Sequence, residues 1–536
     1  MFAFISQFRR LVVTPAGTVS WRVIAIVTGL VALPWLLLVV NRISPLTLGA
    51  EAIGYRFFHP WRIQNGDPGL PFLPQGQTLG LLHHVFVAVA RLEAGGESRL
   101  RLHLDGFAFA TNLSLTLALL GGLLLVRRQP IGFMLMAAIL LFATYACRSG
   151  VYCLVDPDYY GFELASSLFV LGLVVRWHAS PPRNLWASVA LLGAMAGLMA
   201  GIKFTLAPTS LLALAVLLTG QPQPLRRRVE ATALFGLVAA LIFFAVLFLY
   251  YGGHASRLSG HFAMLDQFIK QGVGEERLWR SILAPSSAGA DPGADYGYAR
   301  IVFVVWLAAV SGGLVVCWRP FRPQLAVVLA TTLLLACWHG WGLATRAAGT
   351  TLWEGCHCLL VGAAAVILIL PTAPVRRAAG MTLGALLVAV AFVAGPPRLQ
   401  QLLPVAALRA ASDSIWGAHA EFRAAPGRRV FLIPDNNYTA GTVEETLMKG
   451  FSDHPTWAIT TGEAMLRQFA GNLVVGHDPG AVPADATVFV VEFPHQPLAS
   501  LSGRPVTRYP VAVFPWWIRA ISLYRPVDTR TMPANP

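Results

Sequence analysis

The sequence predicts a polytopic α-helical membrane protein with a small α/β domain after the last membrane helix. Of its 536 residues, 56% are hydrophobic and 12% are charged, and the mean hydropathy is +0.60. This composition lies outside the range of soluble globular chains. Long apolar runs recur across residues 22–395, and arginine clusters occupy every second gap between them. Both features are typical of a chain that crosses a bilayer repeatedly.

Eleven apolar runs are expected to be transmembrane helices, because about 20 helical residues span the hydrocarbon core. They lie at about 22–41, 107–126, 131–147, 161–176, 185–202, 204–220, 230–251, 299–318, 324–342, 356–371 and 378–395. An odd number of crossings would place the N-terminus and the C-terminal residues 396–536 on opposite sides of the membrane.

The arginine clusters predict which side is cytoplasmic. They are Arg9/Arg10, Arg127/Arg128, Arg176/Arg183, Arg226–Arg228, Arg319/Arg322 and Arg376/Arg377. Basic residues near span ends stay in the cytoplasm, so residues 1–21 are expected inside and the longer loops 42–106 and 252–298 outside. The first run is expected to be an uncleaved signal anchor, and the compact loops favour a bacterial inner membrane.

The same clusters account for most of the formal net charge of +14. A nucleic-acid partner is therefore not expected, and membrane lipid is. Two outward loops are expected to carry amphipathic helices at the membrane surface, at Leu79–Arg91 and at His261–Lys270.

After a linker with a short helix, the C-terminal region is expected to alternate strands and helices. Strands are predicted at 429–434, 457–460 and 487–493, and helices at 442–451 and 463–469. This alternation favours a small α/β domain. The region contains no glycine-rich phosphate loop and no hydrolase or metalloprotease motif, so no chemistry is predicted for it.

Four acidic residues in the outward loops are candidates for catalysis. Glu51 and Asp67 lie in the first loop, and Asp156 and Asp158 flank a proline in the short loop before the fourth run. Carboxyl groups near a low-dielectric boundary tend to have raised pKa values, which suits a general base. For Asp156 and Asp158, the competing interpretation is ordinary turn chemistry with helix capping.

Two outward cations are not explained by topology. Lys203 lies at the outer turn between two closely spaced runs, and Arg346 begins the loop before the tenth run. Such cations suit an anionic ligand such as a lipid phosphate. The alternative is that both side chains extend to lipid headgroups.

The cysteines support only weak predictions. Cys147 and Cys153 flank an outward loop and could form a disulfide, whereas Cys317 and Cys337 are expected to pack in the core. Cys356-His357-Cys358 has metal-ligand residue types, but they are consecutive on a helix and no second Cys/His pair is near.

In their order and common sidedness, these features resemble the GT-C superfamily of polyprenyl-phosphate-sugar-dependent glycosyltransferases, of the protein mannosyltransferase and lipid A aminoarabinose transferase type. The features are Glu51 followed by Tyr55, the Asp156–Tyr160 loop, the Gly197–Thr205 segment ending in Lys-Phe-Thr, and the late Arg346. The chain departs from the family at Ala50, where an Asp is usual, and at Ala347, where a Tyr is common.

The resemblance implies inverting transfer of a sugar from a polyprenyl phosphate to an acceptor hydroxyl. It implies Glu51 as the base, with Asp67 as the alternative, and Asp156 or Asp158 as groups that orient the acceptor or share its proton. Lys203 and Arg346 would hold the donor phosphate, and Tyr55 and Tyr159 would contact the sugar or the acceptor. No cofactor is implied, a divalent metal stays open, and the acceptor is not identified.

Two other functions compete with this prediction. A transporter or flippase of a lipid-linked envelope intermediate would need ionisable residues in mid-span, where the sequence shows almost none. A non-catalytic envelope scaffold would use the α/β domain to bind a partner.

Overall fold

A computed structural model gives the fold of the chain. The structure describes residues 14, 17–40, 78, 81, 115–124, 126–145, 159–220, 222–262, 296–318, 322–344, 350–394, 414, 417–418, 421–422, 424–432, 473–476, 482–492, 501, 503–510 and 520–526. The helices form one compact unit, and the strands belong to a second.

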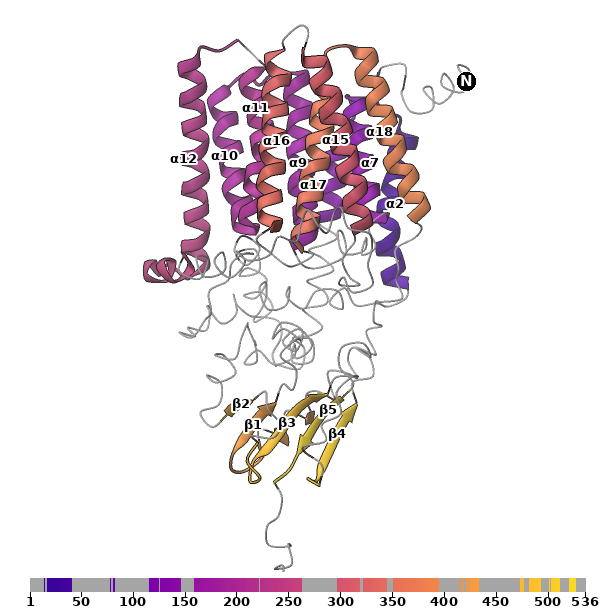
Figure 1. The fold of residues 1–536 in the computed structure, drawn as a ribbon. Coiled ribbons are helices and arrows are strands. Elements are labelled where there is room, and N and C mark those ends of the chain that lie inside the picture. Colours follow the sequence, from indigo (N-terminus) through magenta and orange to yellow (C-terminus); the bar gives the residue numbers. More distant parts are fainter. Residues whose placement is uncertain are drawn as a thin grey trace, which may run out of the picture. The chain divides into compact units, whose positions relative to one another are not determined.

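The apolar helices lie where the sequence has its hydrophobic runs. Their bounds are α2 Trp21–Val40, an unlabelled helix Leu115–Leu124, α7 Pro130–Tyr145, α9 Tyr159–Ala179, α10 Leu185–Ile202, the 3₁₀ helix η4 Phe204–Ser210, α11 Leu211–Thr219, α12 Leu225–Tyr250, α15 Tyr296–Trp318, α16 Pro323–Ala344, α17 Thr350–Ile369 and α18 Ala373–Ala394. The labelled helices stand side by side as one bundle (Figure 1).

The prediction of eleven crossings is corrected by the number of described helices that are able to cross. Among the described residues, 5 helices are long and apolar enough to cross a membrane, within α9, α10, α12, α15 and α18. The other apolar segments run 10–17 described residues, although α2, α16 and α17 are 20, 22 and 20 residues long over their full bounds. After α10 the chain continues as η4 and then as the 9-residue helix α11. The length of α11 is only about 14 Å. The structure supports a multi-pass helical membrane protein without supporting the count of eleven.

Helix α17 lies at the centre of the bundle. It packs against α9, α15 and α16, and the side chains from Leu360 to Ile369 are all buried. A helix that is apolar on all sides requires neighbours on all sides. Any polar group on this helix must therefore find its partner inside the protein.

Helix α12, at the edge of the bundle, packs on a glycine face of α10. A Cβ atom added to Gly193 would lie 2.7 Å from the carbonyl oxygen of Phe235, and one added to Gly197 would lie 2.5 Å from that of Ala239. Small residues four apart allow two membrane helices to approach backbone to backbone. Their spacing therefore explains why α12 stays attached although most of its side chains are exposed.

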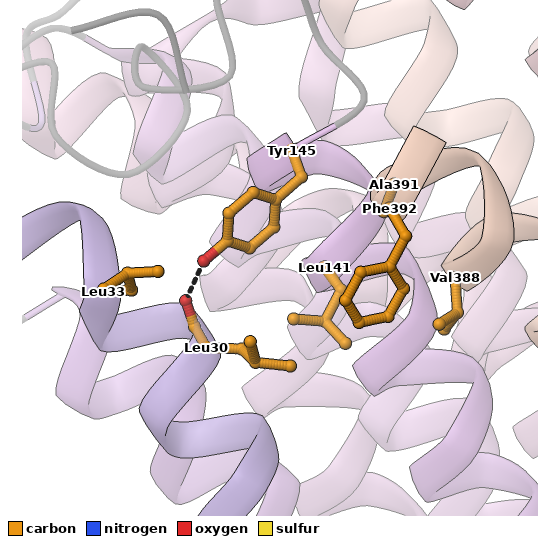
Figure 2. Close-up of a pocket in the computed structure, with 7 residues that line it drawn as sticks. All are labelled: Leu30, Leu33, Leu141, Tyr145, Val388, Ala391 and Phe392. Carbon is orange, nitrogen blue, oxygen red and sulfur yellow. Dashed lines mark hydrogen bonds between the residues drawn. The ribbon is translucent and has the colours of Figure 1, made fainter. Parts of the chain in front are cut away.

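A proline inside α2 leaves one backbone carbonyl without its helical hydrogen-bond donor. Pro34 lacks an N–H, so it cannot donate to the carbonyl of Leu30 one turn earlier. The hydroxyl of Tyr145, from the last residue of α7, donates to that carbonyl instead (Figure 2). A membrane helix tolerates proline where a neighbour satisfies the freed carbonyl. The contact also closes one side of a cavity of about 200 Å³ between α2, α7 and α18.

The outward amphipathic helices are described only in part. Thr78 and Leu81 of the first are helical, and residues 255–262 form a helix that begins before the one expected at His261–Lys270. The remainder of both segments lies outside the described residues.

The second unit contains a five-stranded mixed sheet of order β2-β1-β3-β5-β4. The strands are β1 Arg429–Leu432, β2 Leu473–Gly476, β3 Thr487–Glu492, β4 Val506–Pro510 and β5 Ala520–Tyr524. β1 pairs in parallel with β2 and β3, whereas β5 is antiparallel to β3 and β4. The apolar core contains Val430, Leu432, Val488, Val490 and Leu501.

The predicted strands at 429–434 and 487–493 are confirmed as β1 and β3. The sequence did not predict β2, β4 or β5, and the strand expected at 457–460 and the helices at 442–451 and 463–469 lie outside the described residues. β4 is short and alternates between exposed and half-buried side chains, so it lacks the apolar run that identified the other two strands.

A polar cluster connects Glu421 to β4 and to the residue that follows β5. Glu421 accepts hydrogen bonds from the Tyr509 hydroxyl at 2.5 Å and from Nη2 of Arg525 at 2.8 Å. The Tyr509 hydrogen bond, followed by that from Arg525, lowers the pKa of Glu421. In return Glu421 raises the pKa of Tyr509 to about 12, so the tyrosine remains a donor at neutral pH.

We expect Tyr145→Phe to destabilise the bundle by about 1–3 kcal/mol, because the Leu30 carbonyl would lose its donor in apolar surroundings. Pro34→Ala restores an N–H at the helical position, so the same tyrosine change should cost much less in a Pro34→Ala background. Reversible unfolding in detergent micelles, applied to all four members of this double-mutant cycle, measures the difference. An equal cost in both backgrounds would contradict the role assigned to Tyr145.

Candidate functional site

The bundle has two chemically different ends. Most described arginines of this unit lie before α7 and where α9 meets α10, α11 meets α12, α15 meets α16 and α17 meets α18, at the upper end in Figure 1. Arg257, after α12, and Arg300, near the start of α15, lie at the other end. The arginines at the upper end include Arg128, Arg176, Arg183, Arg226, Arg322 and Arg376. Some also tie this end together: Arg127 lies 4.0 Å from the ring of Trp21, and Nη1 of Arg376 lies 3.0 Å from Nε2 of His178. This is called the arginine end, and the opposite one the Lys203 end.

Lys203 lies at a break in the helical backbone. α10 ends at Ile202, and Lys203 adopts an extended conformation with φ −157° and ψ 123° before η4 begins. Its backbone N–H still donates to the Met199 carbonyl at 2.9 Å, so the break occurs without losing the last α-helical hydrogen bond. Non-helical backbone at membrane depth is tolerated only where protein or a water-filled cavity surrounds it.

The side chain of Lys203 is directed into the bundle. Its ammonium Nζ lies 3.0 Å from Oε1 of Glu163, and the two side chains are 2% and 0% exposed. The alternative that Lys203 extends to lipid headgroups is therefore wrong. A charge this deeply buried is stable only when paired, and the pair joins the start of α9 to the end of α10.

Glu163 was missed by the sequence analysis. It lies near the start of the run at 161–176 that was expected to be a transmembrane helix, and its partner is 40 positions away. The available signal was the acid itself, since an intramembrane carboxyl group is a functional candidate in its own right. Ser167, one helical turn along the same face of α9, is also fully buried.

Other buried polar side chains lie on the elements that pack around this pair. Oγ1 of Thr209 and Sγ of Cys358 share a hydrogen bond of 2.8 Å, which connects η4 to α17. His357 and His339 are buried on α17 and α16. η4 packs against α9, α10 and α16. The Lys203 end thus concentrates ionisable and hydroxyl groups where the helices are otherwise apolar.

The cysteine predictions have mixed outcomes. Cys356, His357 and Cys358 are all buried, and within the described residues no group of 3 or more His, Cys, Asp or Glu side chains is placed to hold a metal ion. Cys317 is buried as expected, but Cys337 is exposed, because it faces outward from α16. Cys147 and Cys153 lie outside the described residues.

Aromatic rings continue outward from Lys203 along the same end. The ring centroid of Phe204 lies 6.2 Å from that of Phe243 and 6.3 Å from that of Trp338. From Phe243 the contacts pass through Phe244 and Phe262 to His261.

His261 closes this series of contacts at the end of α12. Its Nδ1 lies 2.9 Å from the Tyr251 hydroxyl, and both side chains are buried. The aromatic series therefore links α16, η4, α12 and residues 255–262.

Most of the predicted site residues lie outside the described residues. These are Glu51, Tyr55, Asp67, Asp156, Asp158 and Arg346, while Tyr159 is the first residue of α9. The ends of the flanking helices are described: α7 ends and α9 begins at the Lys203 end, and α16 ends and α17 begins at the same end. The structure therefore brings Lys203 together with Glu163 and leaves the other predicted contacts as predictions.

Comparisons with models of protein families, with curated proteins and with solved structures find no match to this chain. Its function is therefore inferred from its own residues.

Removing one member of the Lys203–Glu163 pair should destabilise the bundle more than removing both. Lys203→Met or Glu163→Gln leaves a buried group without its ionic partner, at a cost of about 3–5 kcal/mol, whereas the double change Lys203→Met/Glu163→Leu should recover most of it. Reversible unfolding in detergent micelles measures the free energy of unfolding of each variant.

The control for this cycle is the pair formed by Arg226 and Glu230, which lie 2.8 Å apart but are 89% and 43% exposed. Arg226→Met should cost less than about 0.5 kcal/mol. Additive effects at Lys203 and Glu163 would show that the two side chains do not depend on each other.

Proposed function

We propose that the protein is an integral-membrane glycosyltransferase that moves a sugar from a polyprenyl phosphate to a lipid, glycan or protein hydroxyl. The observation that carries this proposal is the buried Lys203–Glu163 pair at a helix break. It lies at the end of the bundle where the flanking helices deliver the segments that contain the other candidate residues. An ionisable pair maintained inside a membrane protein is costly and marks a functional site by default.

The proposed reaction has a simple atom balance. The bond between the anomeric carbon and the phosphate oxygen breaks, and the leaving polyprenyl phosphate keeps the electron pair. A bond forms between the anomeric carbon and the acceptor oxygen from the opposite face, and a carboxylate takes the acceptor proton. Glu51 is the proposed base with Asp67 as the alternative, and Asp156 or Asp158 orients the acceptor.

Cations at the Lys203 end stabilise the departing phosphate in this proposal. Arg346 is suited to bidentate phosphate contact. Lys203, which pairs with Glu163, contributes its ammonium charge to the same phosphate in this proposal. Tyr55 and Tyr159 are the proposed sugar or acceptor contacts.

Membrane orientation follows from the arginine end. Because basic residues near span ends remain in the cytoplasm, we propose that this end is cytoplasmic and that the site opens outside, in a bacterial inner membrane. α18 begins beside Arg376 and Arg377 and is one of the helices able to cross. The chain after Ala394 would therefore continue outside the cytoplasm.

A topology reporter tests this orientation directly. A reporter inserted at Gln223, between α11 and α12, should respond as cytoplasmic, whereas one fused after residue 400 should respond as extracytoplasmic. Alkaline phosphatase and a cytoplasm-active fluorescent protein at each position give opposite readouts. A cytoplasmic response after residue 400 would place the sheet domain inside and remove the basis for an outward site.

One observation favours a second function. A helix interrupted beside a buried ion pair is also a feature of secondary transporters, whose binding sites are built from broken helices. Transport of an intact polyprenyl-phosphate sugar would move the donor across the bilayer without breaking its sugar–phosphate bond.

Activity assays separate the two functions. In proteoliposomes loaded with labelled polyprenyl-phosphate sugar and membrane extract, the wild-type protein should move label into an acceptor fraction. Glu51→Gln should lower turnover by about 10²–10⁴-fold with donor binding nearly intact, because an amide cannot take the proton. The variants Asp67→Asn, Asp156→Asn and Asp158→Asn rank the remaining acids.

Asp485, an exposed acid in the sheet domain, provides the matched control. Asp485→Asn should keep wild-type turnover. Labelled donor that crosses the bilayer with its phosphate linkage intact would indicate a transporter. Full transfer by all four acid variants would rule out this class of enzyme.

A further inference from the structure

An apolar hollow of about 450 Å³ lies between the helix Leu115–Leu124 and helices α7, α9 and α10. Its volume falls within the range of ligand pockets, about 300–1,000 Å³. Leu119, Met136, Leu168 and Met199 contribute hydrocarbon to its walls, and Arg176 lies at one end. The hollow is separate from the Lys203–Glu163 pair and does not depend on the proposed function.

Two glycines keep the hollow open. A Cβ atom added at Gly122 would meet no atom within 4 Å, and one at Gly172 would meet only the terminal methyl of Met136 at 3.9 Å. This differs from Gly193 and Gly197 on α10, where an added Cβ would strike the α12 backbone. Close helix packing therefore does not explain Gly122 or Gly172.

The dimensions of the hollow fit one hydrocarbon chain. Along α9 it extends from Ala165 to Arg176, about 16 Å at about 1.5 Å per residue. This is about half of the ~30 Å hydrocarbon core, the depth of one leaflet.

The surroundings indicate where such a chain enters and where its headgroup lies. Phe169 in the wall is 50% exposed, and neighbouring Leu117 is 59% exposed, so the hollow borders the surface that lipid covers. Arg176 is exposed at the arginine end, the depth at which a phospholipid chain of that leaflet joins its headgroup. A guanidinium binds phosphate oxygens through directed hydrogen bonds.

We propose that this hollow binds one acyl chain of an anionic phospholipid whose phosphate contacts Arg176. The chain would fill space that no side chain of the described bundle occupies. The lipid would join the helix Leu115–Leu124 to α9 and α10 as a structural component.

Native mass spectrometry of the full-length protein, delipidated and then given phosphatidylglycerol or phosphatidylcholine, tests the proposal. The wild-type protein should retain one phosphatidylglycerol in preference to phosphatidylcholine. Gly172→Leu and Gly122→Leu should each abolish this retention, because the added side chains occupy the hollow without meeting backbone. Arg176→Gln should weaken phosphatidylglycerol binding by about 10-fold, as expected for loss of one charged hydrogen bond.

Gly312→Leu on α15 is the matched control, since an added Cβ there also meets nothing within 4 Å, and it should leave lipid retention unchanged. Wild-type retention in both Gly172→Leu and Gly122→Leu would overturn the location of the chain. Equal binding of the two lipids, unchanged by Arg176→Gln, would overturn the phosphate contact. Preferential retention of added polyprenyl phosphate over phosphatidylglycerol would overturn the phospholipid as occupant.

Discussion

The buried ion pair between Lys203 and Glu163 constrains the structure of the bundle around it. An ammonium removed from water needs an anionic partner at hydrogen-bond distance, and the 3.0 Å contact supplies one. The contact fixes the start of α9 against the end of α10, and Lys203 is also the residue where α10 gives way to η4. Because η4 packs against α16 and is hydrogen-bonded to α17 through Cys358, the pair determines where four helices meet.

Buried backbone groups elsewhere in the bundle also need a hydrogen-bond partner. Pro34 leaves the Leu30 carbonyl without its helical donor, and Tyr145 provides a hydroxyl from another helix. In water this carbonyl would need no protein partner, whereas in hydrocarbon an unsatisfied carbonyl is costly. The positions of α2 and α7 are thus coupled by a polar contact, although nearly all of their surrounding contacts are apolar.

The sequence predicted the parts of the fold that depend on local composition. Apolar runs gave the positions of the helices, and short apolar runs gave β1 and β3, because hydropathy is a property of neighbouring residues. It did not predict the break into η4 after α10, since the conformation of Lys203 depends on tertiary contacts. Lys203 itself was recognised as a residue that requires a partner. Its partner Glu163 was not, because a contact across 40 positions leaves no local pattern, and β4 was missed since one face of it is exposed.

Glycine positions show how one residue type serves opposite purposes in the bundle. In a helix, glycine costs roughly 0.5–1 kcal/mol relative to alanine. At Gly193 and Gly197 the cost is offset by the close approach of α12, since a methyl group would lie 2.7 Å or less from a carbonyl oxygen. At Gly122 and Gly172 no close contact within the described part of the bundle provides such an offset, although both residues line a volume of about 450 Å³. A space that the described helices leave empty at this cost is best stabilised by a molecule from the surrounding membrane, which supplies the dispersion contacts that the missing side chains do not.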